Sequence, residues 1–355
     1  MATKKGDRDS RGGKAGRRKA GRKPTEPKRS GGDPQLVASR STVFQGNLPA
    51  IVLRSPLVGP EPAPGEELMF DLGQLIGSGP QGSLNELNAE LVRLTSGGPI
   101  PRSQPTEPRA KAQRLMYDAW QGSREAGLPL AKRALALDPD CADAHLFLAL
   151  ASRELNEVLK HVFEAVDAGE RTVAREEKEG LDEANLWAYL PARPYLRARA
   201  FLATYLWTMG GRVAAVAVLQ ESLDLDEGDA LGLRYLLLGW CLDMGEEMFT
   251  RELLERYKQE HSAIFLYGNA LLTFWERGEE RTTNARLKRA LAANPHVPER
   301  LVFCPPDPLK VLAINSYRPG GEEEADICAI LLGPAWERDI EAMEWLQEAV
   351  EKSSS

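Results

Sequence analysis

The amino-acid sequence predicts an all-α protein in which about five helical hairpins stack into a superhelix. Three observations support this fold class. From about residue 108 the chain is rich in Ala, Leu, Glu and Arg and poor in proline, which favours helices. Three consecutive windows of 34 residues (196–229, 230–263 and 264–297) align without gaps. Each window also has glycine near its middle, where a hairpin needs a turn.

Residues 1–35 form a basic tail that we expect to be disordered. Residues 1–34 hold 12 Lys and Arg but 4 Asp and Glu, a net charge of +8, whereas the whole chain carries −7. Large apolar side chains are nearly absent from this segment, so nothing offsets the entropy lost on ordering it. The sequence therefore predicts a basic tail on an acidic body.

Residues 36–107 are predicted to form an arm rich in proline and glycine that contains one short helix. Prolines interrupt the strand-like apolar runs in residues 43–58, so we expect an extended backbone there. In residues 84–94 leucine recurs every three or four positions, which predicts an amphipathic helix. The glycine-containing stretch 75–83 lacks the Lys-Ser/Thr ending of a phosphate-binding loop and is interpreted as a simple loop.

Residues 108–337 are predicted to form the repeat domain. Position 11 of the three windows carries a large residue (Leu206, Trp240 and Phe274), which fills the space between neighbouring hairpins. A fourth window, 108–141, ends in RALALDP, close to the RALAANP that ends the third aligned window. This is the tetratricopeptide pattern. The intervening residues are interpreted as a repeat expanded by an insertion, which contains a long helix over 154–178.

Residues 338–355 are predicted to form a C-terminal capping helix with a frayed end. The stretch IEAMEWLQEAV (340–350) is amphipathic. The last repeat of a stack exposes an apolar face, and a closing helix of this kind covers it.

The segment 111–349 resembles bacterial relatives of the suppression-of-tumorigenicity-seven family. The blocks that carry the resemblance are LMYDAW (115–120), ALALDPDCADAHLFLA (134–149), RYLLLGW (234–240), GGEEEADICAILLGPAW (320–336) and above all ANPHVPERL (293–301). The resemblance implies an interaction scaffold with no catalytic residues to carry over. It also implies membrane-spanning segments in animal members, but this sequence has no uncharged stretch of the about 18 residues that such a helix needs. We therefore expect a cytoplasmic protein.

The first helix of each hairpin would line the concave face of the superhelix, chiefly at positions 2, 5, 9 and 12 of the window. The candidate residues for a partner-binding groove are Arg197, Thr204, Trp207, Arg234, Leu238 and Trp275. Arginine and tryptophan on a groove suit a peptide that carries a carboxylate and an apolar side chain. A competing interpretation places these tryptophans in the core between repeats.

The basic tail suggests an alternative function in a nucleic-acid- or ribosome-associated protein. Its candidate contacts are Arg17, Arg18, Lys19, Arg22 and Lys23. Lys and Arg interleaved with small residues bind phosphates without sequence preference, and such binding weakens steeply with salt. The tail lacks the aromatic residues that stack on bases. A purely solubilising tail is the competing interpretation.

The sequence offers no set of catalytic or metal-ligating residues. Its four cysteines are far apart and form no CxxC pair, so we expect free and mostly buried thiols. The four histidines show no ligand spacing, and no nucleophile elbow or Cys–His–Asp set is present. We therefore predict a non-catalytic protein with no cofactor and no metal, which binds a protein or peptide partner.

Overall fold

The regular secondary structure of the described residues is helical. The computed structural model describes residues 59–63, 65–77, 84–96, 98, 100–176, 185–311 and 317–354. Within these ranges, extended backbone pairs only in an isolated bridge between Asn185 and Asp226. The prediction of an all-α protein is confirmed. The basic tail and the strand-like part of the arm up to residue 58 lie outside the described residues.

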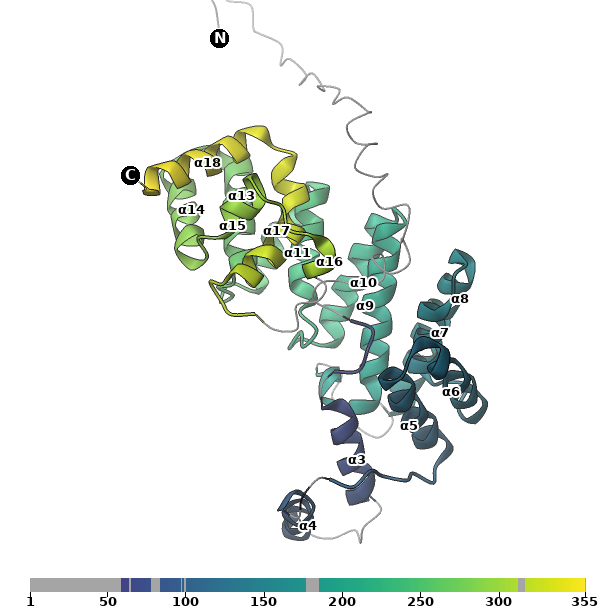
Figure 1. Ribbon diagram of the computed structural model, residues 1–355. Coiled ribbons are helices and arrows are strands. Elements are labelled where there is room, and N and C mark those ends of the chain that lie inside the picture. The colour runs from purple at the N-terminus through teal and green to yellow at the C-terminus, as the bar shows by residue number, and fades with distance from the viewer. Residues whose placement is uncertain are drawn as a thin grey trace, which may run out of the picture. The chain divides into compact units, whose positions relative to one another are not determined.

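Two helices of the arm precede the repeat region, and the remaining helices follow in chain order (Figure 1). They are α3 (Glu66–Gly77), α4 (Leu84–Ser96), α5 (Pro108–Gln121), α6 (Arg124–Leu137), α7 (Ala142–Ala151), α8 (Leu155–Glu176), the 3-10 turns η3 (Leu186–Ala188) and η4 (Leu190–Ala192), α9 (Arg193–Thr208), α10 (Arg212–Leu225), α11 (Leu233–Met244), α12 (Glu247–Arg256), α13 (Ala263–Arg277), α14 (Arg281–Ala293), α15 (Val297–Val302), α16 (Pro308–Val311), α17 (Glu322–Glu337) and α18 (Ile340–Ser354).

From α5 onward, consecutive helices pack on each other in pairs. Helix α5 packs on α6, α7 on α8, α9 on α10, α11 on α12 and α13 on α14. The first helices of successive pairs also touch, as α5 with α7, α7 with α9 and α11 with α13. This packing is consistent with a helical-repeat fold. The long helix expected in the expanded repeat is α8, which spans 22 residues.

Glycines make the turns between paired helices, as the repeat pattern predicts. Gly210, Gly245 and Gly278 have φ angles of +85°, +73° and +67°. Residues with a side chain rarely adopt this left-handed region, because the Cβ atom then crowds the backbone. Each glycine therefore ends the first helix of its pair and lets the chain reverse.

The arm contains two helices, whereas the sequence predicted one. The predicted helix is α4, and α3 is the additional one. Its first turn is fixed locally, since the Glu66 N–H donates to the Ala63 carbonyl at 3.0 Å and the Ala63 N–H donates to Glu66 Oε2 at 3.3 Å. Residues 75–77 of the predicted loop 75–83 are the end of α3, and the others lie outside the described residues.

The C-terminal helices pack back on the repeat region. Helix α17 packs against α11, α13 and α15, and α18 packs against α14, α15 and α17. All of these helices contribute to one core, in which Trp336 is fully buried. The residues expected to form a closing helix are therefore helical and cover the last pair.

The four thiols are free, as expected: Cys141, Cys241 and Cys328 are buried, and Cys304 is exposed. No helix in the described ranges combines the length and the apolar character needed to cross a bilayer. The same ranges hold no group of three or more His, Cys, Asp or Glu side chains arranged to bind a metal ion.

Candidate functional site

Helix α3 lies against three arginines from two first helices of the repeat region. We call Arg114 of α5 together with Arg193 and Arg197 of α9 the arginine bay. Figure 1 shows α3 beside the end of α9 at which Arg193 begins that helix. The carboxylates that enter the bay are Glu66, Glu67 and Asp71, all from α3.

The deepest ion pairs of the bay surround Arg197. Its Nη1 donates to Glu66 Oε1 and Oε2 at 3.0 and 2.9 Å, and its Nη2 donates to Asp143 Oδ1 and Oδ2 at 2.8 and 3.0 Å. Arg197 is 1% exposed, and both carboxylates are fully buried. Arg193 Nη1 lies 3.9 Å from Glu66 Oε2 and brings the second positive charge. The planar guanidinium thus joins α3 to α7 and α9 through paired bonds.

Arg114 holds the other two carboxylates of α3. Its Nη1 lies 2.7 Å from Glu67 Oε1 and its Nη2 lies 2.6 Å from Asp71 Oδ1. The guanidinium carbon lies 5.2 Å from the ring centroid of Phe70, which itself packs on Tyr117 at 5.3 Å. The acidic side chains and the aromatic ring of α3 therefore contact one surface of α5, formed by Arg114 and Tyr117.

Burial raises the pKa of Glu66 above its ordinary value of 4.5, although the Arg197 charge acts in the opposite direction. The buried Asp143 carboxylate of α7 adds to the rise, and Tyr117 of α5 donates to Glu66 Oε1 at 3.4 Å. Desolvation therefore outweighs the attraction of Glu66 to Arg197, and it shifts the carboxyl towards its protonated form.

The raised pKa of Glu66 predicts that the free energy of unfolding depends on pH, and the substitution Glu66→Gln should remove this dependence. A carboxyl whose folded pKa is raised stabilises the fold fully below its unfolded pKa, and the contribution is lost as the pH rises through the folded pKa. The free energy of unfolding of the wild type, relative to Glu66→Gln, should therefore fall over the pH range above the ordinary carboxyl pKa of 4.5. Urea denaturation across this range measures it. A difference that does not change with pH would contradict the assignment.

The arginines predicted to line a groove make their contacts within the chain. Arg197 is buried in the bay. Arg234 Nη1 donates to Asp229 Oδ2 at 2.8 Å, and its Nη2 donates to Glu260 Oε2 at 2.9 Å. Both guanidinium groups are therefore bound to carboxylates of the chain itself.

Of three further predicted groove residues, Leu238 is buried, whereas Trp207 and Thr204 are half-buried. Trp207 stacks on Trp240 with ring centroids 4.4 Å apart, the inter-repeat position that the competing interpretation expects. The Thr204 hydroxyl donates to the Ala200 carbonyl of its own helix at 2.9 Å. Leu238 is fully buried in the core that α17 shares with α11 and α13.

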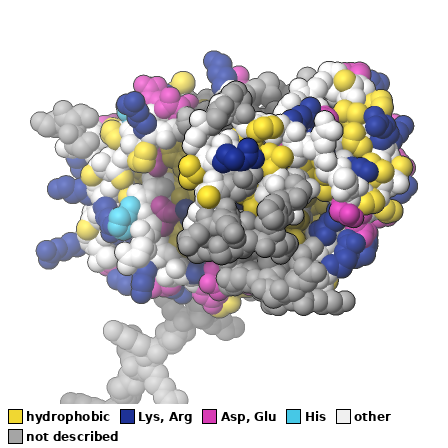
Figure 2. All heavy atoms as spheres, turned by 90° about the horizontal axis from the view of Figure 1, so that it is seen from below, with side chains coloured by type: hydrophobic (Ala, Val, Ile, Leu, Met, Phe, Trp, Pro, Cys, Tyr) yellow, Lys and Arg dark blue, Asp and Glu magenta, His cyan; other side chains and the backbone are white. Residues whose placement is uncertain are grey.

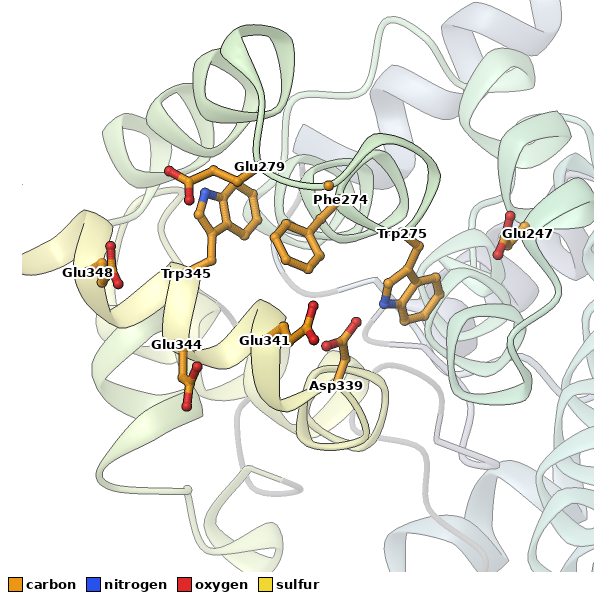
Figure 3. Close-up of a pocket in the computed structure, with 10 residues that line it drawn as sticks. Glu247, Phe274, Trp275, Glu279, Asp339, Glu341, Glu344, Trp345 and Glu348 are labelled. Atoms are coloured by element: carbon orange, nitrogen blue, oxygen red, sulfur yellow. The ribbon is translucent and has the colours of Figure 1, made fainter. Parts of the chain in front are cut away.

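Trp275, the remaining predicted groove residue, lines an open pocket with a volume of about 630 Å³. We call this hollow the Trp275 pocket (Figure 3). Its aromatic wall also contains Phe274 and Trp345, whose rings lie 4.8 Å apart and nearly parallel. The Trp345 Nε1–H donates to Asn284 Oδ1 at 2.7 Å, which fixes the orientation of that ring.

Carboxylates from three parts of the chain surround these rings. They are Glu247 of α12, Glu279 of the turn before α14, Asp339 before α18, and Glu341, Glu344 and Glu348 of α18. In Figure 3 the carboxylates of Asp339 and Glu341 point into the space between Phe274 and Trp275. Asp339 also accepts the Ala342 N–H at 3.1 Å, so its position is set by the start of α18. The pocket therefore combines π faces with excess negative charge.

Comparisons with known proteins do not add a relative. No family model matches the sequence, and no curated protein matches it significantly. The resemblance to the suppression-of-tumorigenicity-seven family therefore stays a prediction. The candidate tail residues Arg17, Arg18, Lys19, Arg22 and Lys23 lie outside the described residues, so their contact with nucleic acid stays a prediction as well.

Proposed function

We propose that this chain is a cytoplasmic, non-catalytic scaffold, a tetratricopeptide-like superhelix of about five hairpins that binds a segment of a partner protein. The paired packing of α5 to α14 supports the architecture. The observation that carries the function is the Trp275 pocket, where six carboxylates surround three aromatic residues. These groups suit a partner segment rich in Lys or Arg.

The pocket favours an organic cation for two reasons. A lysine or arginine over a tryptophan face gains about 0.5–2 kcal/mol from the ring quadrupole, according to how far the pair is desolvated. The surrounding carboxylates also repel one another, and a bound cation relieves that repulsion. Cations of the chain offset part of this repulsion, since Lys352 Nζ lies 2.9 Å from Glu348 and also interacts electrostatically with Glu279, and Arg251 does so with Glu247. A strongly hydrated metal ion would gain little from the aromatic wall.

The face shown in Figure 2 gives no comparable support to nucleic-acid binding. Its described Lys and Arg side chains stand at separate points among other side chains instead of forming one continuous patch. Phosphate backbones are bound best by several neighbouring cations. The partner-protein function is therefore the one that we propose.

Peptide binding to charge variants of the Trp275 pocket tests this function. The probe is a fluorescein-labelled peptide of alternating Lys, Arg and Leu, and fluorescence anisotropy gives its affinity. The double substitution Glu341→Gln and Glu344→Gln is expected to weaken binding about tenfold, because two carboxylates that line the pocket are lost. Trp275→Ala should weaken it by a similar factor, since the π face is removed.

The matched control is the double substitution Glu252→Gln and Glu255→Gln. These two glutamates are exposed on α12 and do not line the pocket, so the net charge changes equally while the pocket stays intact. The control variant should bind the peptide like the wild type. Equal weakening in both double variants would mean that overall charge, and not the pocket, determines binding.

A further inference from the structure

Helix α3 sits in the arginine bay in the way that a partner helix would. We propose that the bay is a docking surface for an acidic amphipathic helix of a partner protein, and that α3 is its internal occupant, which the partner displaces. This inference goes beyond the proposed function, because it concerns a second surface of the chain. It concerns a surface on α5, α7 and α9, whereas the Trp275 pocket lies on α12, α13 and α18.

The charges of the bay and of its occupant are complementary. Both ion pairs of Arg114 are made to α3, at Glu67 and Asp71, and Arg197 shares its charge between α3 and Asp143 of α7. Gln121 donates to Glu67, and the Ser103 N–H donates to Asp71 Oδ1 at 2.9 Å. Without a bound helix, Arg114, Gln121 and Ser103 would lose these acceptors, and Arg197 would keep Asp143. The bay is therefore built to receive carboxylates.

The spacing in α3 defines what an occupant must present. Two adjacent carboxylates are followed by an aromatic residue four positions after the first, and by a third carboxylate five positions after it (Glu66, Glu67, Phe70, Asp71). In a helix these positions share one side. Glu66, Phe70 and Asp71 are the buried residues of α3, which confirms that this side faces the bay. A partner helix with this pattern would make the same contacts.

Helix α3 itself fills the bay incompletely. A cavity of about 470 Å³ remains beside it, lined by residues of α3 that include Gly73, by residues of α5, α8 and η4, and by the connection from α6 to α7 with Asp138 and Asp140. A Cβ atom built at Gly73 would meet no other atom within 4 Å. The large apolar residues Leu68 and Met69 of α3 are 46% and 42% exposed. A helix with a larger side chain at the position of Gly73 would bury more apolar surface and could replace α3.

Competition by a synthetic helix tests the inference on the full-length chain. The probe is a fluorescein-labelled peptide with the sequence of residues 61–77 and the substitution Gly73→Leu. The protein variant carries Glu67→Gln and Asp71→Asn, which weaken the hold of the internal α3 without removing its helix. We expect the probe to bind this variant at least tenfold more tightly than it binds the wild type.

Two controls tie this binding to the bay. The first control is a neutral form of the probe, in which Glu66, Glu67 and Asp71 are replaced by Gln, Gln and Asn. It should bind the protein variant at least tenfold more weakly than the acidic probe does. Adding Arg114→Gln to the protein variant should weaken probe binding by a similar factor, whereas adding Arg251→Gln, at an exposed pair with Glu276 outside the bay, should not change it. Circular dichroism and urea denaturation establish that each variant is folded.

Three results would overturn the inference. The neutral peptide could bind as tightly as the acidic one, the probe could fail to bind a folded variant, or the variant alone could form dimers in analytical ultracentrifugation. Dimers would assign the bay to α3 of a second copy. The same proteins are titrated with the Lys/Arg peptide. If the Lys/Arg peptide binds and the acidic probe does not, the docking role of the bay is rejected and the proposal for the Trp275 pocket stands. If the acidic probe binds and the Lys/Arg peptide does not, the proposal for the Trp275 pocket is rejected.

Discussion

Replacing Arg197 with methionine is expected to lower the free energy of unfolding by about 3–5 kcal/mol, the largest effect that we predict. The substitution leaves Glu66 and Asp143 fully buried without the guanidinium that binds both of them. Arg193, at 3.9 Å from Glu66, is too distant to replace the lost hydrogen bonds. Urea denaturation followed by far-UV circular dichroism measures the change.

Neutralising the two stranded carboxylates is expected to recover most of this loss. In the triple variant Arg197→Met, Glu66→Gln and Asp143→Asn, neither acidic side chain leaves a buried charge without the guanidinium of residue 197, and amides are far less costly to bury than carboxylates. Arg251→Met removes a comparable pair with Glu276 on the exposed surface and should leave stability nearly unchanged. If Arg197→Met were as stable as Arg251→Met, the ion pairs of the bay would not anchor α3.

The sequence was sufficient to predict the helices of the repeat region because their signals are local. Glycines mark the turns, and three of them adopt the left-handed backbone that only glycine enters easily, Gly210, Gly245 and Gly278. Helix α3 has no such signal. Its defining contact joins Glu66 to a residue 131 positions later, Arg197, and no local pattern reports a partner at that distance.

The candidate site was predicted only in part, for a related reason. The repeat frame placed Arg197 and Arg234 on first helices, but it could not show that the chain supplies their carboxylates. Of the tryptophans, Trp207 stacks between hairpins and Trp275 faces the open pocket. The periodicity is the same for both, so only tertiary packing distinguishes them.

The carboxylates of the Trp275 pocket have one local signal in the sequence. Glu341, Glu344 and Glu348 recur at intervals of three and four residues, which places them on one side of α18. The pocket also needs Glu247 and Glu279, which come from other parts of the chain. Their proximity follows from the way α18 packs over the last pair of helices.

Substituting Gly239 with alanine is expected to lower the free energy of unfolding by about 1–3 kcal/mol, or more if α17 cannot shift. A Cβ atom at this position of α11 would lie 2.6 Å from the Leu331 carbonyl oxygen and 3.2 Å from its carbonyl carbon. These are backbone atoms of a helix that is buried along most of its length, so no flexible side chain can move aside. Urea denaturation of the variant measures the cost.

Gly333→Ala is the matched control, because it makes the same chemical change in α17. A Cβ atom there would meet nothing within 4 Å, and alanine is favoured over glycine inside a helix by about 1 kcal/mol. This variant should therefore be as stable as the wild type or more stable. If Gly239→Ala were as stable as Gly333→Ala, the close crossing of α11 and α17 would not be a determinant of the fold. The burial of Leu238 beneath α17 would then need another explanation.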